Sequence, residues 1–283
     1  MKLIHSLILS LAMPFAMQAV EPADTVTIFM IGDSTMANKK LEKENQERGW
    51  GQMLPIYLEG AVKVDNHAVN GRSSKSFIDE GRWDVVKEKI RPGDYVIIQF
   101  GHNDEKIKDE KRYTVPGASF DDNLRRFVTE AREKGATPII MNSIVRRNFP
   151  APTGETQEDT DDKQADWNPD KKTYQTEGDV LIDTHGEYII APRRVAEEMD
   201  VVFVDMNALT HSLVQGLGRD LSQQMFMWIP ADTYEFCPKG KVDNTHLNVL
   251  GGILVSHLAV NELAEKVPAL KPYIRKEVYN LNK

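Results

Sequence analysis

A serine, a histidine and an aspartate in this sequence have the residue types and the spacing that hydrolysis by a nucleophilic hydroxyl requires. Ser34 lies in Gly-Asp-Ser-Thr at 32–35, after an apolar run, and Asp243 and His246 stand three residues apart near the C-terminus. A serine hydroxyl becomes a good nucleophile when an imidazole takes its proton and a carboxylate orients that imidazole. Each motif alone is weak, because a serine after a strand is usually a cap and Asp-x-x-His is common. Together they predict Ser34 as nucleophile, His246 as base and Asp243 as the orienting carboxylate.

Further residues could stabilise the oxyanion that forms when an ester is attacked. Gly71 lies in Asn-Gly-Arg-Ser-Ser at 70–74, and Asn103 lies in Gly-His-Asn-Asp at 101–104. A glycine lets the backbone approach a ligand closely, and an asparagine side chain can donate a hydrogen bond. With the backbone N–H of Ser34, these groups form a candidate oxyanion hole of the kind that acyl transfer uses.

The elements that must position these residues follow an α/β pattern. Apolar segments alternate with helical or loop segments, which predicts a parallel sheet with helices on both faces. Helical periodicity is clear around 120–131 and from about 248 to 266, and the Asp-x-x-His pair is expected on a polar loop before that last helix. Since open parallel sheets bind ligands at the carboxyl ends of their strands, the candidate residues should meet at one edge. The five candidate strands are 26–31, 62–66, 95–100, 138–143 and 201–205.

The chain is expected to form one domain, residues 20–283, after a secretory signal peptide at residues 1–19. Lys2 gives that signal a positive start, an apolar stretch follows, and Ala19 is a suitable last residue before cleavage. A membrane anchor is the weaker alternative, because the apolar run is short and contains Pro14. A polar insertion at about 148–178 is either a solvated surface loop or part of the substrate cleft. We therefore expect an exported protein, periplasmic or extracellular.

Composition excludes several classes of function. The formal net charge is −8, and it becomes −9 once Lys2 leaves with the signal. This acidic balance argues against nucleic acid and against anionic membrane surfaces, and no other segment is apolar enough for membrane insertion of the mature chain. Cys237 is the only cysteine, so no intramolecular disulfide can form. No His-Glu-x-x-His or paired-cysteine spacing indicates a metal, and the oligomeric state is left open.

Four blocks, in this order, resemble the SGNH (GDSL-like) hydrolase family. They are Gly-Asp-Ser after the first predicted strand, the glycine after the second, Gly-x-Asn-Asp after the third, and Asp-x-x-His near the C-terminus. The fuller segments Gly-Asp-Ser-Thr-Met at 32–36, Gly-Trp-Gly at 49–51 and Asp-Asn-Thr-His-Leu at 243–247 are similar to the rhamnogalacturonan acetylesterase branch. The resemblance extends over nearly the whole mature chain.

The resemblance implies a fold, a set of roles and a substrate class. The fold is a three-layer α/β/α sandwich with a five-stranded parallel sheet, flavodoxin-like, that needs no metal or organic cofactor. Ser34 would be the nucleophile, His246 the base and then the acid, and Asp243 the orienting carboxylate. The N–H groups of Ser34 and Gly71 and the side chain of Asn103 would form the oxyanion hole. The function implied is an exported serine carbohydrate esterase that removes acetyl groups from plant cell-wall polysaccharide, with pectic rhamnogalacturonan as the first candidate.

Several alternatives remain open at this point. The same chemistry could act on acetylated xylan, on a short-chain acyl ester or on a lipid or thioester, and a non-catalytic carbohydrate-binding protein could share the scaffold. An acidic polymer would need a local basic patch on this acidic chain. Arg72 and Arg146, with the neighbouring Arg147, follow predicted strands and could supply it as substrate-binding groups, although exposed arginines are usually only solvated. His102, next to Asn103, is interpreted as a scaffold residue that shapes its loop.

Overall fold

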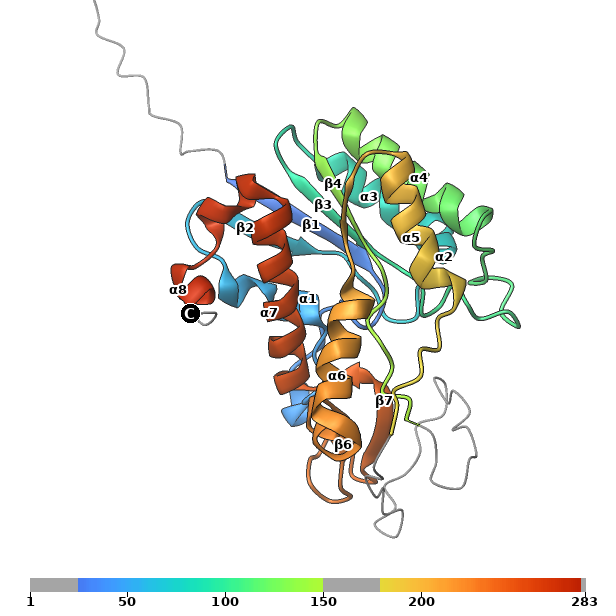
Figure 1. The fold of residues 1–283 in the computed structure, drawn as a ribbon, viewed down its shortest axis with the longest axis vertical. Helices are drawn as coiled ribbons and strands as arrows, with labels where there is room; N and C mark the ends of the chain where they lie inside the picture. The colour runs from blue at the N-terminus through green and yellow to red at the C-terminus, as the bar shows by residue number, and fades with distance from the viewer. Residues whose placement is uncertain (1–24, 150–178, 281–283) are drawn as a thin grey trace, which may run out of the picture.

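A five-stranded parallel sheet lies at the centre of the computed structural model, which describes residues 25–149 and 179–280 (Figure 1). The expected signal peptide at 1–19 and almost all of the polar insertion at 148–178 lie outside the described residues. The strand order is β2-β1-β3-β4-β5. β2 is therefore added on one side of β1, and the later strands are added on the other side. The predicted α/β class with five parallel strands is confirmed. The strands are β1 (Val26–Gly32), β2 (Val62–Asn66), β3 (Tyr95–Gln99), β4 (Thr137–Met141) and β5 (Val202–Val204).

Side chains of the central strands alternate between two apolar layers. On β1, Ile28 and Met30 pack on one face of the sheet, whereas Phe29 and Ile31 pack on the other. This period of two is what a strand buried on both faces requires, and it explains why the central strands are almost continuously apolar. The sheet is therefore the middle layer of three, as Figure 1 shows.

Helices cover both faces of the sheet. α2 (Ser74–Asp79), α3 (Arg82–Lys89), α4 (Ser119–Glu133) and α5 (Glu187–Glu198) pack over one face. α1 (Trp50–Met53), α6 (Met206–Ser222) and α7 (Val249–Lys266) pack over the other. The two helices predicted from periodicity are α4 and α7. The remaining elements are short, namely η1 (Glu42–Glu44), η2 (Leu54–Tyr57), η3 (Gln223–Met225), η4 (Pro268–Tyr273) and α8 (Lys276–Asn280).

An antiparallel hairpin that the sequence pattern did not predict completes the structure. Its strands are β6 (Phe226–Ile229) and β7 (Lys241–Leu247). In Figure 1 the hairpin lies beyond the edge of the sheet at which the parallel strands end, and α7 begins directly after it. The hairpin therefore brings a segment from the end of the chain to the edge where a ligand is expected.

Candidate active site

Ser34 lies in a tight turn directly after β1. The N–H of Ala37 donates to the carbonyl oxygen of Asp33 at 3.1 Å, which closes the turn around the serine. Gly32 is required by a close approach, because a Cβ there would lie 2.6 Å from the carbonyl oxygen of Gln99 on β3. The turn thus presents the Ser34 hydroxyl at the carboxyl edge of the sheet, next to the point where the strand order reverses.

The Gly-Trp-Gly segment at 49–51 packs against the nucleophile turn. A Cβ at Gly49 would lie 2.3 Å from the carbonyl oxygen of Ala37, so only glycine fits there. Trp50 is fully buried, and its indole N–H donates to the side-chain oxygen of Gln99 at 2.7 Å. This packing holds the turn that carries Ser34 against the central strands.

Asp243 and His246 lie within β7, and the prediction of a polar loop at this position was wrong. In a straight strand, residues three apart point to opposite faces. A bulge resolves the conflict, since Met227 of β6 pairs with Asp243 while the neighbouring Phe226 pairs with Leu247. The carboxylate of Asp243 also accepts the backbone N–H of His246 at 2.9 Å. The bulge therefore turns both side chains toward the same site.

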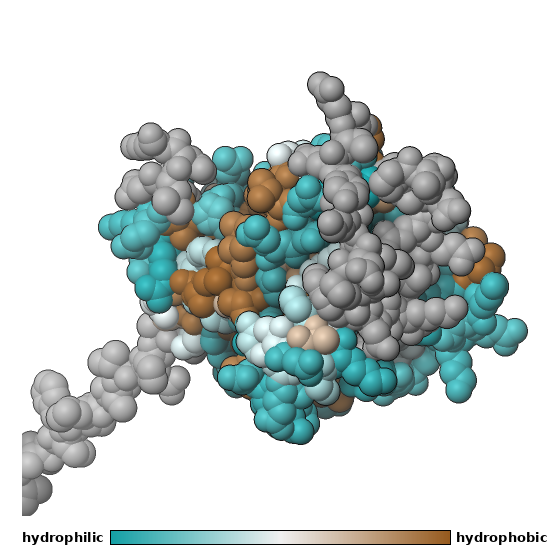
Figure 2. All heavy atoms as spheres, turned by 90° about the horizontal axis from the view of Figure 1, so that it is seen from below, coloured by the Kyte–Doolittle hydropathy of each residue, from teal (hydrophilic) through white to brown (hydrophobic). Residues whose placement is uncertain are grey.

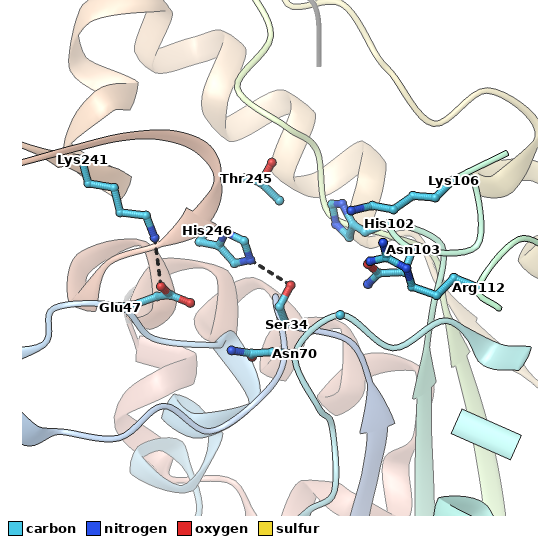
Figure 3. A pocket seen from close by; sticks show the side chains of 11 residues that line it. Ser34, Glu47, Asn70, His102, Asn103, Lys106, Arg112, Lys241, Thr245 and His246 are labelled. Carbon is cyan, nitrogen blue, oxygen red and sulfur yellow. Dashed lines mark hydrogen bonds and ion pairs between the residues drawn. The ribbon is translucent and has the colours of Figure 1, made fainter. Parts of the chain in front are cut away.

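The structure brings Ser34, His246 and Asp243 into one hydrogen-bonded chain. His246 Nε2 lies 2.9 Å from Ser34 Oγ (Figure 3). His246 Nδ1 lies 2.8 Å from Asp243 Oδ2. A carboxylate can only accept at this contact, so Nδ1 carries the proton and Nε2 is left to accept the serine proton. This geometry can activate a hydroxyl for attack on an ester, and the catalytic roles of the three residues remain predictions.

A buried ion cluster, Lys39, Glu47 and Lys241, supports the aspartate of this chain. Lys241 Nζ lies 3.1 Å from Asp243 Oδ2 and 3.1 Å from Glu47 Oε2, and Lys39 Nζ lies 2.8 Å from Glu47 Oε1. The segment that carries Glu47 is tied to the end of β7, because Glu47 forms an antiparallel bridge with Asn248. The cluster therefore extends the hydrogen-bonded chain away from Ser34 by a row of alternating charges.

The ion cluster shifts the pKa values of its members in opposite directions. Burial opposes ionisation of Asp243, but His246 and Lys241 outweigh it and hold the pKa of Asp243 well below its usual range. Burial likewise opposes ionisation of Glu47, yet the nearby cations lower the pKa of Glu47 to about 2. Burial lowers the pKa of Lys39, whereas two carboxylates outweigh burial and raise the pKa of Lys241. The orienting carboxylate therefore stays ionised in the folded protein.

The three candidate oxyanion donors gather around Ser34. Gly71 has a φ of +73° with open space where a Cβ would be, so glycine is needed for its left-handed backbone. The Asn103 amide donates to the carbonyl oxygen of Arg72 at 3.2 Å, and its oxygen accepts from Arg112 at 3.1 Å. Ser34, Gly71 and Asn103 all line one pocket. The structure thus brings all three residues to the pocket that contains Ser34, and their role as oxyanion donors remains a prediction.

The pocket beside Ser34 is small and polar. Its volume is about 210 Å³, which is below the range of cavities that bind drug-sized ligands. Figure 2 shows this end of the molecule from outside. Hydrophilic side chains cover much of the edge of the molecule in this view, and a group of apolar side chains lies nearer its middle. Within residues 25–149 and 179–280, no group of three or more acidic, histidine or cysteine side chains could hold a metal. The pocket is lined by Ser34, Glu47, Asn70, Gly71, His102, Asn103, Lys106, Arg112, Lys241, Thr245 and His246.

The family of this chain follows from comparison with known proteins. Residues 30–251 match the GDSL-like lipase/acylhydrolase family. This chain belongs to that family. The assignment made from four short sequence blocks is thereby confirmed, and the protein is an esterase.

Relatives of this esterase include proteins with a more specific name. Rhamnogalacturonan acetylesterase RhgT of Bacillus subtilis is 33% identical over 249 residues, which cover 88% of this chain and 94% of the relative. A rhamnogalacturonan acetylesterase of Emericella nidulans is 38% identical over 93 residues, which cover 32% of this chain and 34% of the relative.

Solved structures show the same fold. The structure of protein YxiM from Bacillus subtilis superposes with a TM-score of 0.62 at 25% identity, and the match covers 87% of this chain and 58% of that longer chain. Axe2, an acetylxylan esterase from Geobacillus stearothermophilus, superposes with a TM-score of 0.52 at 18% identity, over 86% of this chain and 95% of that one.

The arginines predicted to bind substrate do not line the pocket of this esterase. Arg146 is 3% exposed and forms a buried ion pair with Glu105, because a guanidinium removed from water needs a carboxylate partner. Arg72 pairs with Glu80 at 3.0 Å and does not line the pocket, although its Nη1 donates to the carbonyl oxygen of Asn70 and its own carbonyl accepts from Asn103. Arg147 is also buried. The position of an arginine after a strand did not reveal the direction of its side chain.

His102 lines the pocket but is not part of the hydrogen-bonded chain of Ser34, His246 and Asp243. Its ring is 2% exposed, and neither ring nitrogen has a hydrogen-bond partner in the part of the chain that the structure describes. Burial holds the pKa of His102 well below its usual range, and His185 and Arg146 lower it further. A neutral, buried ring packed edge-on against His185 agrees with the interpretation of His102 as a scaffold residue.

Sequence reasoning missed four charged residues of the pocket. Lys241 stands two positions before Asp243, a spacing that puts both on one face of a strand, but this segment was interpreted as a loop. Lys106 and Arg112 follow Asn103 in the loop after β3, and their place in that loop was a usable signal. Glu47 left no such signal, because it reaches the site only through pairing with the end of β7.

Proposed function

We propose that this esterase removes acetyl groups from acetylated rhamnogalacturonan after export from the cytoplasm. The observation that carries the esterase chemistry is the contact of His246 Nε2 with Ser34 Oγ at 2.9 Å, beside the contact of His246 Nδ1 with Asp243 at 2.8 Å. The names of the relatives from Bacillus subtilis and Emericella nidulans support an acetylated carbohydrate as the substrate. The small, polar pocket favours an acetyl group over a long acyl chain.

The first half of the proposed reaction acylates Ser34. Its Oγ attacks the carbonyl carbon of the acetyl ester while His246 Nε2 takes the hydroxyl proton. The negative charge that develops on the carbonyl oxygen is stabilised by the N–H groups of Ser34 and Gly71 and by the amide of Asn103. The imidazolium form of His246 is stabilised by the ionised Asp243. The C–O bond to the sugar breaks, and the sugar hydroxyl leaves with the proton from His246.

The second half repeats these steps with water. His246 Nε2 takes a proton from a water molecule, and the resulting nucleophile attacks the acetyl carbonyl on Ser34. The same donors stabilise the second oxyanion. When it collapses, acetate leaves and Ser34 regains its proton from His246. Every proton in the cycle therefore passes through one imidazole, whose orientation depends on Asp243.

Acetate release from two polymers tests the proposal. Wild-type protein and Ser34→Ala would be incubated with acetylated rhamnogalacturonan and with acetylated xylan, and free acetate would be measured. We expect release from rhamnogalacturonan by the wild type and a loss of about 10⁴-fold or more in Ser34→Ala. Release from xylan alone would keep the chemistry and overturn the substrate. Export is tested separately by the N-terminal sequence of protein secreted from an expression host, which should start at residue 20.

A further inference from the structure

Two loop cations, Lys106 and Arg112, stand on the opposite side of the catalytic centre from the buried ion cluster. In Figure 3, Glu47 and Lys241 lie on one side of the Ser34–His246 pair, and Lys106 and Arg112 lie on the other, beside Asn103. Both loop cations line the pocket. Both come from the segment between β3 and α4, and the N–H of Lys106 donates to the carbonyl oxygen of Asn103 at 3.3 Å.

The loop cations add two positive side chains to the lining of the pocket, whereas Asp109, the ion-pair partner of Arg112, does not line it. Lys241 also lines the pocket, but Glu47 and Asp243 both lie within 3.1 Å of its ammonium and compensate its charge. His102 contributes no charge, since burial lowers its pKa well below the usual range. The positive charge at Lys106 and Arg112 is local, because the whole chain carries a net charge of −8.

Arg112 is held in place by two hydrogen bonds. Its Nε donates to Asp109 at 2.6 Å, and its Nη1 donates to the side-chain oxygen of Asn103 at 3.1 Å. A guanidinium has five N–H donors, so these two contacts leave donors for a planar anion. The contact with Arg112 also fixes the oxygen of the Asn103 amide as the acceptor. The NH₂ group of Asn103 therefore points away from Arg112 and donates to the carbonyl oxygen of Arg72.

We propose that Lys106 and Arg112 bind the carboxylate of a uronic acid residue in the substrate, and that they make this esterase selective for acetylated acidic polysaccharide over neutral polysaccharide. This inference rests on the proposed function and adds the residues that set specificity. A carboxylate bound by an ammonium and a guanidinium forms charge-assisted hydrogen bonds, which are the stronger kind. The cations adjoin the oxyanion donor Asn103, so the carboxylate would lie close to the acetyl group that is removed.

A matched pair of substrates isolates the carboxylate. The first is an acetylated rhamnogalacturonan oligosaccharide, and the second is the same oligosaccharide with its carboxylates converted to methyl esters. The readout is kcat and KM for acetate release, since methyl-ester cleavage would release methanol instead. Lys106→Ala should raise KM on the charged substrate about tenfold more than on the methylated one, the size expected from one lost charge-assisted hydrogen bond. Lys106→Arg, which keeps the charge, should restore most of the preference.

Lys108→Ala is the control for a charge removed from the same loop. Lys108 is exposed and does not line the pocket, so the variant should keep the wild-type preference for the charged substrate. Arg112→Gln should weaken the preference and also lower kcat on both substrates, because Arg112 holds the oxyanion donor Asn103. Raised salt should reduce the wild-type preference, since it screens the attraction between exposed charges.

The results separate failure of this inference from failure of the proposed function. If the wild type deacetylates both oligosaccharides and Lys106→Ala changes KM equally on both, the inference is overturned and the proposed function stands. If the wild type cleaves p-nitrophenyl acetate but neither oligosaccharide, the proposed function is overturned and the inference with it. A wild type that prefers the methylated oligosaccharide would also overturn the inference.

Discussion

Two groups of charges flank the same serine, and their surroundings give them different tasks. The charges of the buried ion cluster are paired with one another, and Lys241 lies between the carboxylates of Glu47 and Asp243. The loop cations are partly exposed: the Arg112 side chain is 23% exposed, and its partner Asp109 lies outside the pocket lining. Charges that are buried and mutually paired fix geometry, whereas charges that remain open to solvent can exchange water for a ligand.

The two groups of charges let one acidic chain combine catalysis with positive side chains in its pocket. The pairing of Lys241 keeps Asp243 ionised and in position without offering a positive charge to the substrate. Lys106 and Arg112 offer that charge from a separate loop. Removing a member of the buried group should therefore change kcat, whereas changing the loop cations should change mainly the discrimination between substrates.

The largest expected effect comes from changing Asp243, which connects the buried ion cluster to His246. Asp243→Asn should lower kcat on p-nitrophenyl acetate by about 10⁴-fold, because an amide favours the wrong tautomer of His246. The substitution keeps the shape of the side chain, so circular dichroism should show an intact fold. A fall of less than tenfold would show that His246 does not depend on Asp243.

A smaller effect is expected at Lys241, which acts through Asp243. Lys241→Met should lower kcat by roughly 10-fold to 100-fold, because Asp243 and Glu47 lose the ammonium that holds them, and a hydrogen bond to a charged group contributes about 1.5–3 kcal/mol. KM for the charged oligosaccharide should change little by comparison, which distinguishes this variant from Lys106→Ala. Lys63→Met, which removes an exposed lysine on β2, is the control and should keep wild-type kcat. A change in KM alone would contradict the separation of tasks.

The smallest expected effect is on stability in acid, through Glu47. Its pKa is about 2 in the folded protein and about 4.3 in an unfolded chain, so its ionisation stabilises the fold above pH 4.3. That contribution, on the order of 3 kcal/mol, is lost as the pH falls from about 4.3 toward 2. Urea unfolding of Glu47→Gln should therefore show a shallower loss of stability between pH 5 and pH 2.5 than the wild type. Equal slopes in the two proteins would show that the lysine partners do not lower the pKa of Glu47 in the folded protein.

The sequence allowed much of the fold to be predicted. The five strands of the sheet and the long helices α4 and α7 follow from apolar runs and helical periodicity, which are local properties of the chain. Each strand is predicted to within two residues at each end, and β3, β4 and β5 end one or two residues earlier than expected. The hairpin was missed because β6 is short and β7 is polar, so neither has the alternation that identifies a strand.

The candidate site was predictable in part. Ser34, Gly71 and Asn103 could be placed because each follows a strand of one parallel sheet, and such strand ends meet at one edge. The substrate-binding arginines could not be placed in the same way, since the sequence does not show whether a guanidinium turns outward or pairs with a buried carboxylate such as Glu105. Lys106 and Arg112 lie in the loop after β3, which was a usable signal for closeness to the site, but only the tertiary structure shows that they line the pocket.

Strand periodicity and short motifs with a fixed chemistry are local features, so the fold class, the family and the three residues of the hydrogen-bonded chain could be predicted from the amino-acid sequence. Only the tertiary structure decided how Asp243 and His246 come to face one another, which requires the bulge in β7. Only the tertiary structure, too, divided the charges into a buried cluster and two loop cations. Burial and pairing depend on contacts between residues such as Glu47 and Lys241, which lie far apart in the chain, and no local pattern contains that information.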